Sequence, residues 1–323
     1  MRHPRRLAIG LLSAAALSTG PTVAWADDGS IVLDFIRHGE SGDMTAINTM
    51  VPGPDLTEVG EKQASDLATA LQHSGIDEIY ASTMVRSQET AAPLIEALSS
   101  MNNGSGVPVE FLAQLNEIDA GIFEGAPVNV GDLPLGGALY LLAPALWTLG
   151  LTSVPELGST DANGIVFDQR VDEAVQTIYE GSAAGDTDAV FSHEGTIAIW
   201  TLMNVNNPDF ALVVKELFTT GELLPYTGQV VVDGSPGDWT LVSWDGTPVP
   251  EDPGLLTDLF VDFRSYIEVP QLAGYDIYEA FLTGNAATID SAVQLGFSQI
   301  ETAAAQFPVA VFDDIVTALG GSV

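Results

Sequence analysis

The sequence predicts an α/β protein: a layered α/β/α domain with a mostly parallel central sheet, followed by a C-terminal helical appendage. Three observations lead to this prediction. Short apolar runs alternate with segments of helical periodicity between residues 31 and 245. The first apolar run, at residues 31–36, is nearly continuous, as is typical of a buried parallel strand. Beyond residue 254, apolar side chains recur at helical spacing.

The predicted elements of the domain alternate between strand and helix. In chain order they are a strand at 31–36, a loop at 42–55, a helix from the cap Thr57 to Gln72, a strand at 76–81, a helix capped by Ser82 and ending near residue 98, a loop at 102–106, a strand at 107–112, a helix at 167–180, a strand at 188–192 and a hairpin of strands at 229–232 and 239–244. This alternation favours helices packed on both faces of a sheet.

Three stretches lie outside the alternation. Residues 130–156 are mostly apolar but are interrupted by proline and glycine, and their length is also compatible with a membrane span. Because the segments that bear chemistry on either side must lie in one compartment, we favour a lid-like insertion within a domain of residues 27–247. Residues 245–254 are rich in proline, glycine and acid and predict a linker. Residues 255–323 predict a helical extension whose role the sequence leaves open.

The first 26 residues have the pattern of an export signal. Three arginines precede an apolar stretch at residues 7–17, and Ala24-Trp25-Ala26 is a small-x-small cleavage site, so we expect cleavage after Ala26. The apolar stretch is short for a membrane span. We therefore expect a secreted or cell-envelope protein with no membrane span in the mature chain. The sequence does not distinguish the general from the twin-arginine export route.

The charge balance excludes whole classes of partner. The chain of 323 residues has 44 Asp+Glu and 9 Lys+Arg, a net charge of −35. The predicted signal contains three arginines and no acid, so the remainder has six basic against 44 acidic residues, a net charge of −38. Such a surface repels nucleic acid and anionic lipid headgroups. The absence of cysteine excludes thiolate nucleophiles, cysteine metal sites and disulfides, so stability must come from a sizeable core.

The few basic side chains and histidines fall where predicted strands end. Arg37 and His38 follow the first strand, Arg86 lies in the first turn of the helix after the second strand, and His193 follows the strand at 188–192. The carboxyl ends of parallel strands meet at one edge of a sheet, where ligands bind. Two guanidiniums can bind a phosphate, and an imidazole can attack it. Each residue also has a structural alternative. Arg37 and His38 could form a structural ion pair, Arg86 could be a solvated helix residue, and His193 could be a core histidine.

Five segments in chain order resemble the histidine phosphatase superfamily, in its phosphoglycerate mutase-like branch. The segments are FIRHGES at 35–41, PDLTEVGEKQA at 54–64, ASTMVRSQETA at 81–91, LNEIDAGIFEG at 115–125 and FSHEGTI at 191–197. The resemblance covers residues 31 to about 245 and leaves out the tail. It implies a phosphoglycerate mutase-like fold.

The resemblance also implies a mechanism that uses no metal or other cofactor. His38 would attack phosphorus and form a phosphohistidine. Arg37, Arg86 and His193 would bind the equatorial oxygens of the phosphoryl group. Glu117 would protonate the leaving alkoxide and then deprotonate the attacking water. The implied protein is a metal-independent phosphomonoesterase for a small phosphomonoester, and the apolar insertion favours hydrophobic over highly charged substrates.

Two positions depart from the family pattern. Met44 stands where the family often has asparagine, and Asn48 is a candidate to replace it. Glu194 stands where the family usually has glycine after the second histidine. A carboxylate there could repel a phosphate or point outward to solvent.

Three functions stay open at this point. A phosphomonoesterase leads, followed by a phosphatase-fold protein with a binding or cell-surface role, and then by a phosphoglycerate-type mutase. A mutase needs extra cations for the substrate carboxylate, and the chain has few left. The acid is also open, because Asp119 and Glu124 lie close to Glu117. The oligomeric state is not fixed by the sequence.

Overall fold

The computed structural model describes residues 29–320, apart from 43–44, 102–105 and 130–134. Four features of the sequence analysis therefore lie wholly or partly outside the described residues: the expected signal at 1–26, Met44, most of the loop at 102–106, and the start of the apolar insertion.

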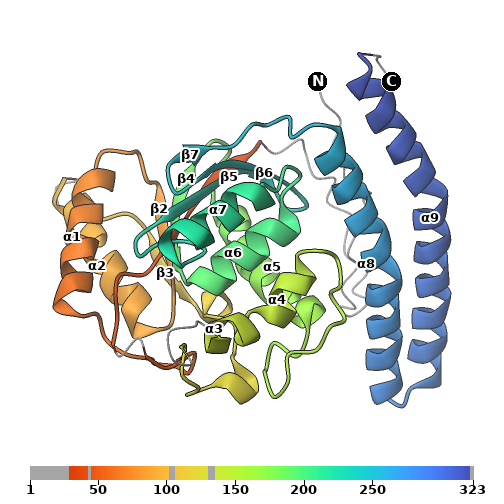
Figure 1. The fold of residues 1–323 in the computed structure, drawn as a ribbon, viewed down its shortest axis with the longest axis horizontal. Coiled ribbons are helices and arrows are strands. Elements are labelled where there is room, and N and C mark those ends of the chain that lie inside the picture. Colours follow the sequence, from red (N-terminus) through yellow and green to blue (C-terminus); the bar gives the residue numbers. More distant parts are fainter. Residues whose placement is uncertain (1–28, 43–44, 102–105, 130–134, 321–323) are drawn as a thin grey trace.

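A seven-stranded sheet forms the centre of the described chain, with the strand order β3-β2-β4-β1-β5-β6-β7 (Figure 1). The strands are β1 Ile31–Arg37, β2 Glu78–Ser82, β3 Val109–Leu112, β4 Thr187–Ser192, β5 Gln229–Ser235, β6 Asp238–Trp244 and β7 Thr247–Pro248. Strands β1 to β4 pair in parallel, whereas β5, β6 and β7 pair antiparallel. The predicted central sheet, mostly parallel at its core, and its closing hairpin are confirmed.

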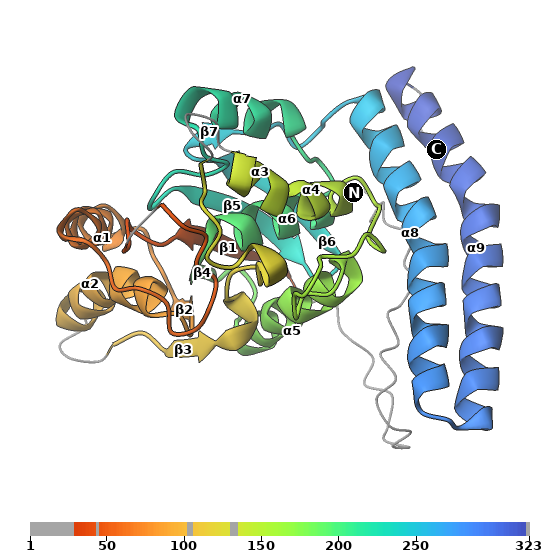
Figure 2. The same cartoon turned by 60° about the horizontal axis from the view of Figure 1, so that its bottom comes forward.

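Helices cover both faces of the sheet, which confirms the layered α/β/α prediction (Figures 1 and 2). The helices of the domain are α1 Glu58–Leu71, α2 Val85–Met101, α3 Leu135–Tyr140, α4 Leu142–Trp147, α5 Gly164–Gly181, α6 Glu194–Asn204 and α7 Phe210–Thr220, with short 3₁₀ turns at Ala113–Leu115 and Gly121–Phe123. One core joins Ile36 to α1 and α2. The other joins Leu33 and Phe35 to α5 and α6. Successive β1 side chains alternate between these cores because a strand has a period of two.

Helices α6 and α7 were not predicted. Almost every residue of α6 after its first is buried, so this helix lacks the polar face on which helical periodicity depends. The predicted cap at Thr57 is confirmed, because its side chain accepts a hydrogen bond from Gly60 N. The predicted cap at Ser82 is wrong in position: Ser82 is the last residue of β2, and α2 begins at Val85.

The described part of the apolar insertion forms α3 and α4. Tyr140 and Trp147 are buried, and the Trp147 ring stacks on Phe167 at a centroid distance of 5.6 Å. Within the described ranges, no helix is both long and apolar enough to span a membrane. The insertion therefore packs on the domain, and its movement as a lid stays a prediction.

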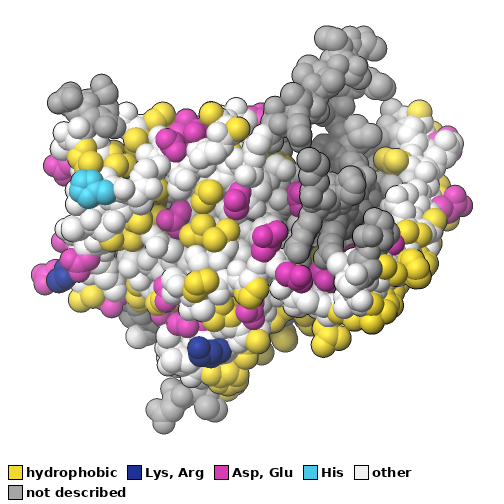
Figure 3. Space-filling model, turned by 90° about the horizontal axis from the view of Figure 1, so that it is seen from above, with side chains coloured by type: hydrophobic (Ala, Val, Ile, Leu, Met, Phe, Trp, Pro, Cys, Tyr) yellow, Lys and Arg dark blue, Asp and Glu magenta, His cyan; other side chains and the backbone are white. Residues whose placement is uncertain are grey.

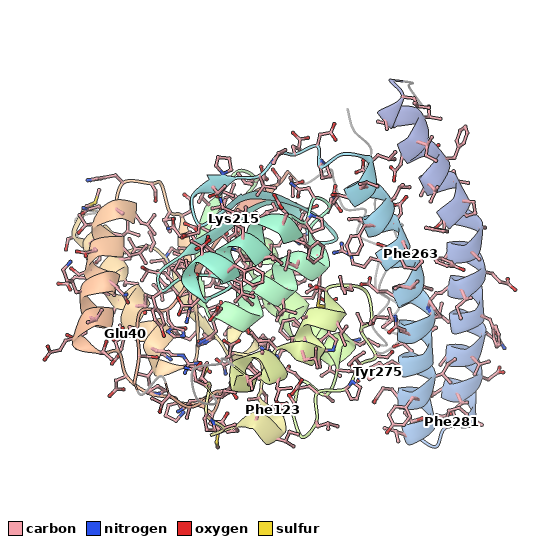
Figure 4. The ribbon with its side chains drawn as sticks, viewed as in Figure 1. Glu40, Phe123, Lys215, Phe263, Tyr275 and Phe281 are labelled. Carbon is pink, nitrogen blue, oxygen red and sulfur yellow. The ribbon has the colours of Figure 1, made fainter. Side chains whose placement is uncertain are left out.

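The tail forms two long helices, α8 Leu255–Leu282 and α9 Ala286–Ala318, packed side by side as a hairpin (Figures 1 and 2). The buried Arg264 of α8 donates to the carbonyls of Leu202 (2.5 Å) and Val205 (3.1 Å) at the end of α6. Along α8, Phe263 packs near Phe307 of α9, while Tyr275 lines a recess between α8 and the domain (Figure 4). The predicted helical character of the tail is confirmed.

Candidate active site

The pairing of β1 with β4 brings the two histidines together. Arg37 lies opposite Ser192 in the parallel register, and His38 N donates to Ser192 O at 3.1 Å. The next residue after each strand is therefore a histidine at the same edge of the sheet. The rings of His38 and His193 lie 5.1 Å apart between centroids, and both residues are buried.

Arg86 reaches the same point from the first turn of α2, whose preceding strand β2 pairs with β4. Its Nε donates to His38 Nε2 at 3.0 Å and to His193 Nδ1 at 3.2 Å. The far end of the guanidinium passes close to Gly53, where an added Cβ would lie 2.7 Å from Arg86 NH1. The absence of a side chain at position 53 therefore leaves space for the Arg86 guanidinium.

The hydrogen bonds of His38 fix its tautomer. Nδ1 lies 2.7 Å from Gly39 O. Because a carbonyl oxygen can only accept, Nδ1 carries the proton and Nε2 keeps its lone pair. Burial, and then the positive charges of Arg86 and Arg37, lower the pKa of His38 well below its ordinary value. The imidazole is therefore neutral, with its lone pair in the pocket, which is the form that a nucleophile requires.

His193 is fixed from the opposite side by Ser82. Its Nε2 lies 2.8 Å from Ser82 Oγ, which also accepts from Met84 N at 3.2 Å. Burial, and then Arg86, lower the pKa of His193 well below its ordinary value. Because Nδ1 accepts from Arg86 Nε, the neutral ring carries its proton on Nε2, which donates to Ser82 Oγ. Since a hydroxyl can donate or accept, Ser82 also permits the tautomer with the proton on Nδ1 once a phosphate takes the place of this contact with Arg86. The serine that was expected to cap α2 thus belongs to the site.

Glu117 lies against the start of α6. Its Oε1 accepts from Ile118 N and Thr196 N, both at 2.9 Å, and its Oε2 accepts from Gly195 N at 3.3 Å. An added Cβ at Gly195 would lie 2.8 Å from this carboxylate, so the glycine permits the contact. Glu117 is also the main charge that opposes the lowering of the pKa of Arg86 by burial. The carboxylate is therefore oriented beside the arginine of the pocket.

The two rival acids have structural partners in the loops. Asp119 Oδ2 accepts from the Thr160 hydroxyl at 2.8 Å, and Glu124 Oε2 accepts from the Thr49 hydroxyl at 2.7 Å. Neither of them acts on the charge of Arg86 as Glu117 does. Of the three candidates, the structure brings Glu117 to the pocket.

Arg37 has a different environment from Arg86. Its NH1 donates to Leu224 O and lies 3.2 Å from Glu194 Oε2 and 3.3 Å from Glu222 Oε1. The ring of Tyr226 lies 4.1 Å from its Cζ. Arg37 Nε is buried and has no hydrogen-bond partner among the described residues. Such an unpaired donor is costly, and a phosphate oxygen would satisfy it.

The expectation that Glu194 could point to solvent is wrong. The side chain turns toward Arg37, and its Oε1 accepts from Leu223 N at 2.5 Å. Burial raises the pKa of Glu194, while Arg37 opposes the shift. The physical reason is that a cation and a main-chain donor stand within reach of this side chain, so pairing replaces hydration.

Several neighbours of the pocket were missed from the sequence. Glu222 and Tyr226 come from the segment between α7 and β5, and Tyr140 comes from α3, where its hydroxyl donates to Ile118 O at 2.7 Å. No spacing rule connects these positions with the Arg-His-Gly motif. Asn48 is exposed, and its proposed replacement of the residue at position 44 stays a prediction. Among the described residues, no group of three or more His, Asp or Glu side chains could bind a metal ion.

The chain is similar to several known proteins. The PE-PGRS family protein PE_PGRS11 of Mycobacterium tuberculosis is 45% identical over 305 residues, which is 90% of this chain and 49% of that protein. A 2,3-bisphosphoglycerate-dependent phosphoglycerate mutase of Nitrobacter winogradskyi is 33% identical over 97 residues, which is 29% of this chain and 45% of that protein. This chain thus spans about half the length of the curated relatives it matches.

A solved structure, the mycobacterial glucosyl-3-phosphoglycerate phosphatase, is 18% identical with a TM-score of 0.48 and covers 68% of this chain and 100% of its own. The family model of the histidine phosphatase superfamily (branch 1) matches residues 33–245. That range begins within β1, ends just after β6, and includes both histidines and both arginines of the pocket. The chain therefore belongs to the histidine phosphatase superfamily, branch 1.

Proposed function

We propose that the protein is a phosphomonoesterase that works through a phosphohistidine at His38. One observation carries the proposal: His38 Nδ1 donates to Gly39 O, so the lone pair of the ring is on Nε2, the nitrogen that faces Arg86 in the pocket. Arg86 Nε donates to this nitrogen in the structure. A phosphoryl oxygen would accept the hydrogen bond of Arg86 in its place and leave the lone pair of Nε2 facing phosphorus.

The reaction proceeds in two balanced steps. His38 Nε2 attacks phosphorus, the ester P–O bond breaks, and the leaving oxygen takes the electron pair together with a proton from Glu117. Water then attacks the phosphohistidine, gives a proton to Glu117 and releases inorganic phosphate and neutral imidazole. Arg86, Arg37 and His193 stabilise the charge on the equatorial oxygens. These side chains supply the neutralising charge, so the scheme requires no metal ion.

Exposed apolar side chains on the segments that lead to and from the pocket support a substrate with a hydrophobic body. We call them the apolar rim, and they are Met50, Val51, Ile122, Leu135, Leu139 and Leu142. Their segments are joined by main-chain bonds, since Ile47 N donates to Ala126 O at 2.9 Å and Gly136 N to Val128 O at 3.0 Å. Residues 50 and 51 adjoin Gly53, which touches the end of Arg86. An apolar leaving group can therefore lie against the rim while its phosphate contacts Arg86.

The activity is tested with the purified protein, an aryl phosphate and the variant His38→Ala. We expect release of inorganic phosphate by the wild-type protein and a loss of at least ~10³-fold in kcat/KM for the variant, since the nucleophile is gone. Comparison with a sugar phosphate tests the hydrophobic preference. Equal rates for the two proteins, or no turnover by either, would leave a binding role for the fold and contradict the enzyme proposal.

The phosphoglycerate mutases among the relatives favour a mutase as the second candidate. A mutase returns the phosphoryl group to a substrate hydroxyl instead of passing it to water. Incubation with 3-phosphoglycerate distinguishes the two, because a mutase forms 2-phosphoglycerate whereas a phosphatase forms glycerate and inorganic phosphate. We expect the phosphatase products.

We also propose that the protein is exported, on the basis of the signal pattern at residues 1–26. The mass of the protein from the culture medium or cell envelope of the native host tests this. We expect a chain that begins at Asp27, and a full-length protein confined to the cytoplasm would contradict it.

A further inference from the structure

Given the proposed phosphatase function, we propose that Glu194 and Glu222 form a cation subsite beside the phosphate pocket. The substrate class that fits is a phosphomonoester with an ammonium group close to the ester. A substrate with a carboxylate or second phosphate at that place is disfavoured.

The two carboxylates compete for one nitrogen atom. Glu194 Oε2 and Glu222 Oε1 lie 3.2 and 3.3 Å from Arg37 NH1, and the same NH1 donates to Leu224 O. One guanidinium charge can offset only one of the two carboxylate charges. An excess negative charge therefore remains beside Arg37, and a second cation would neutralise it.

The two acids are partly exposed, whereas the arginine between them is buried. The side chains of Glu194 and Glu222 are 21% and 31% exposed, against 4% for Arg37. A phosphate oxygen bound to the unpaired Arg37 Nε would lie on the order of 7 Å from these carboxylates, given two hydrogen bonds and the width of a guanidinium. An ammonium group two or three bonds beyond the ester oxygen can span that distance.

Tyr226 extends the same wall with an aromatic face. Its ring packs on the Arg37 guanidinium and lies 6.0 Å from the His38 ring between centroids. Burial raises the pKa of Tyr226 to about 12, so the side chain is a neutral phenol near pH 7. An aromatic ring beside carboxylates is an environment that favours ammonium groups over anions.

The charge balance of the pocket points the same way. Arg37 and Arg86 carry two positive charges against the two carboxylates of Glu194 and Glu222, while both histidines are neutral and Glu117 carries the proton that it gives to the leaving oxygen. A phosphate dianion alone adds two further negative charges, and a substrate carboxylate would add a third. The chain as a whole does not compensate, because its net charge is −35. Acidic side chains are also spread over the upper face of the molecule, shown in Figure 3. An ammonium group is the substituent that reduces the imbalance.

Binding of three phosphonates of similar size tests the subsite without requiring turnover. The probes are 2-aminoethylphosphonate, propylphosphonate and phosphonoacetate, titrated calorimetrically into the full-length protein at low salt. We expect the ammonium probe to bind about tenfold more tightly than the neutral one, and the carboxylate probe to bind most weakly, as charge differences at this range imply.

Two acid-to-amide variants assign the preference to the subsite. Glu222→Gln should reduce the ratio of affinities for the ammonium and neutral probes by several-fold, and the double variant with Glu194→Gln should bring the ratio close to one. Glu173→Gln removes the same charge from an exposed position on α5 and should leave the ratio unchanged. Equal affinity of the wild-type protein for the ammonium and neutral probes would overturn the subsite, as would a preference that survives in the double variant.

The phosphatase function fails by a separate result. If the protein releases no phosphate from an aryl ester yet binds the ammonium probe preferentially, the subsite stands and the proposed catalysis falls. If it hydrolyses the ester without any preference among the probes, the catalysis stands and the subsite falls.

Discussion

The two arginines of the pocket are both buried, but their surroundings are opposite. Arg86 donates to neutral imidazoles, with Glu117 as its main opposite charge nearby, so more of its positive charge is available to an incoming anion. Arg37 contacts two carboxylates and a carbonyl, so much of its charge is already offset. The family motif places an arginine at each position, yet its neighbours decide how strongly it attracts phosphate. The pocket thus has one strong anion anchor and one arginine whose role is closer to positioning and selection.

Removal of each arginine in turn tests this difference most strongly. We expect Arg86→Ala to lower kcat/KM for an aryl phosphate by ~10³-fold, since it removes charge stabilisation and the partner of His38 together. Arg37→Ala should cost only about tenfold, because part of its charge is compensated. Steady-state kinetics measures both losses, with thermal unfolding to show that the variants fold. Equal losses would show that the carboxylates do not weaken Arg37.

A substitution beside Arg86 should displace this arginine and leave Arg37 in place. Gly53→Ala places a Cβ against the end of the Arg86 guanidinium, and we expect kcat/KM to fall about tenfold because the arginine is displaced. Gly75→Ala is the matched control: Gly75 also has a positive φ, 81° against 76° at Gly53, but nothing lies within 4 Å of its added Cβ. Both variants should lose similar stability, and comparable activity in both would contradict the steric account.

Acidification should make more of the positive charge of Arg37 available to an anion, as the charge of Arg86 already is. Burial raises the pKa of Glu194, so this carboxyl becomes neutral at a higher pH than an ordinary glutamate and then no longer offsets Arg37. His38 stays unprotonated over the same range because its pKa is lowered.

We therefore expect kcat/KM to rise several-fold more on acidification in the wild-type protein than in Glu194→Gln, which has no carboxylate to neutralise. Protonation of the substrate affects both proteins equally, so it cancels in the comparison. The pH profiles of the two proteins, measured with one aryl phosphate, give the ratio. Parallel profiles would mean that Glu194 does not titrate against Arg37.

Replacement of Arg264 should have the smallest effect on activity. It tests whether the loss of a buried arginine outside the pocket affects catalysis. This arginine is 1% exposed and donates to main-chain carbonyls at the C-terminal end of α6, with no imidazole or carboxylate of the pocket among those partners. Arg264→Leu should lower the free energy of unfolding by about 3 kcal/mol, because buried carbonyls lose their donor. Activity per folded molecule should change less than twofold. Denaturant unfolding and kinetics measure the two quantities, and a large kinetic effect would link the tail to the site.

The sequence was informative where strand ends and rare residue types coincide. His38, His193 and Arg86 could be placed at one edge of the sheet because parallel strands end together and the chain has few other cations. Ser82, Glu222 and Tyr226 could not be placed there. Ser82 resembles an ordinary helix cap, and the other two lie on a connection whose path depends on α6 and α7.

Helix α6 shows the same limit for secondary structure. Its residues are buried on all sides between the sheet and the outer helices, so the pattern that identifies a surface helix is absent. The pairing of Glu194 with Arg37 depends on where α6 begins. Without that start, the sequence left two alternatives for Glu194, repulsion of the phosphate or exposure to solvent.

The central claim is a covalent intermediate on His38, and trapping it is the most direct test. The protein is mixed briefly with a ³²P-labelled aryl phosphate, quenched in alkali and digested for mass spectrometry. We expect label on the peptide that contains His38, stable to alkali and lost in acid as a phosphoramidate is, and no label in His38→Ala. Turnover without such label, or label that persists in the variant, would contradict the mechanism.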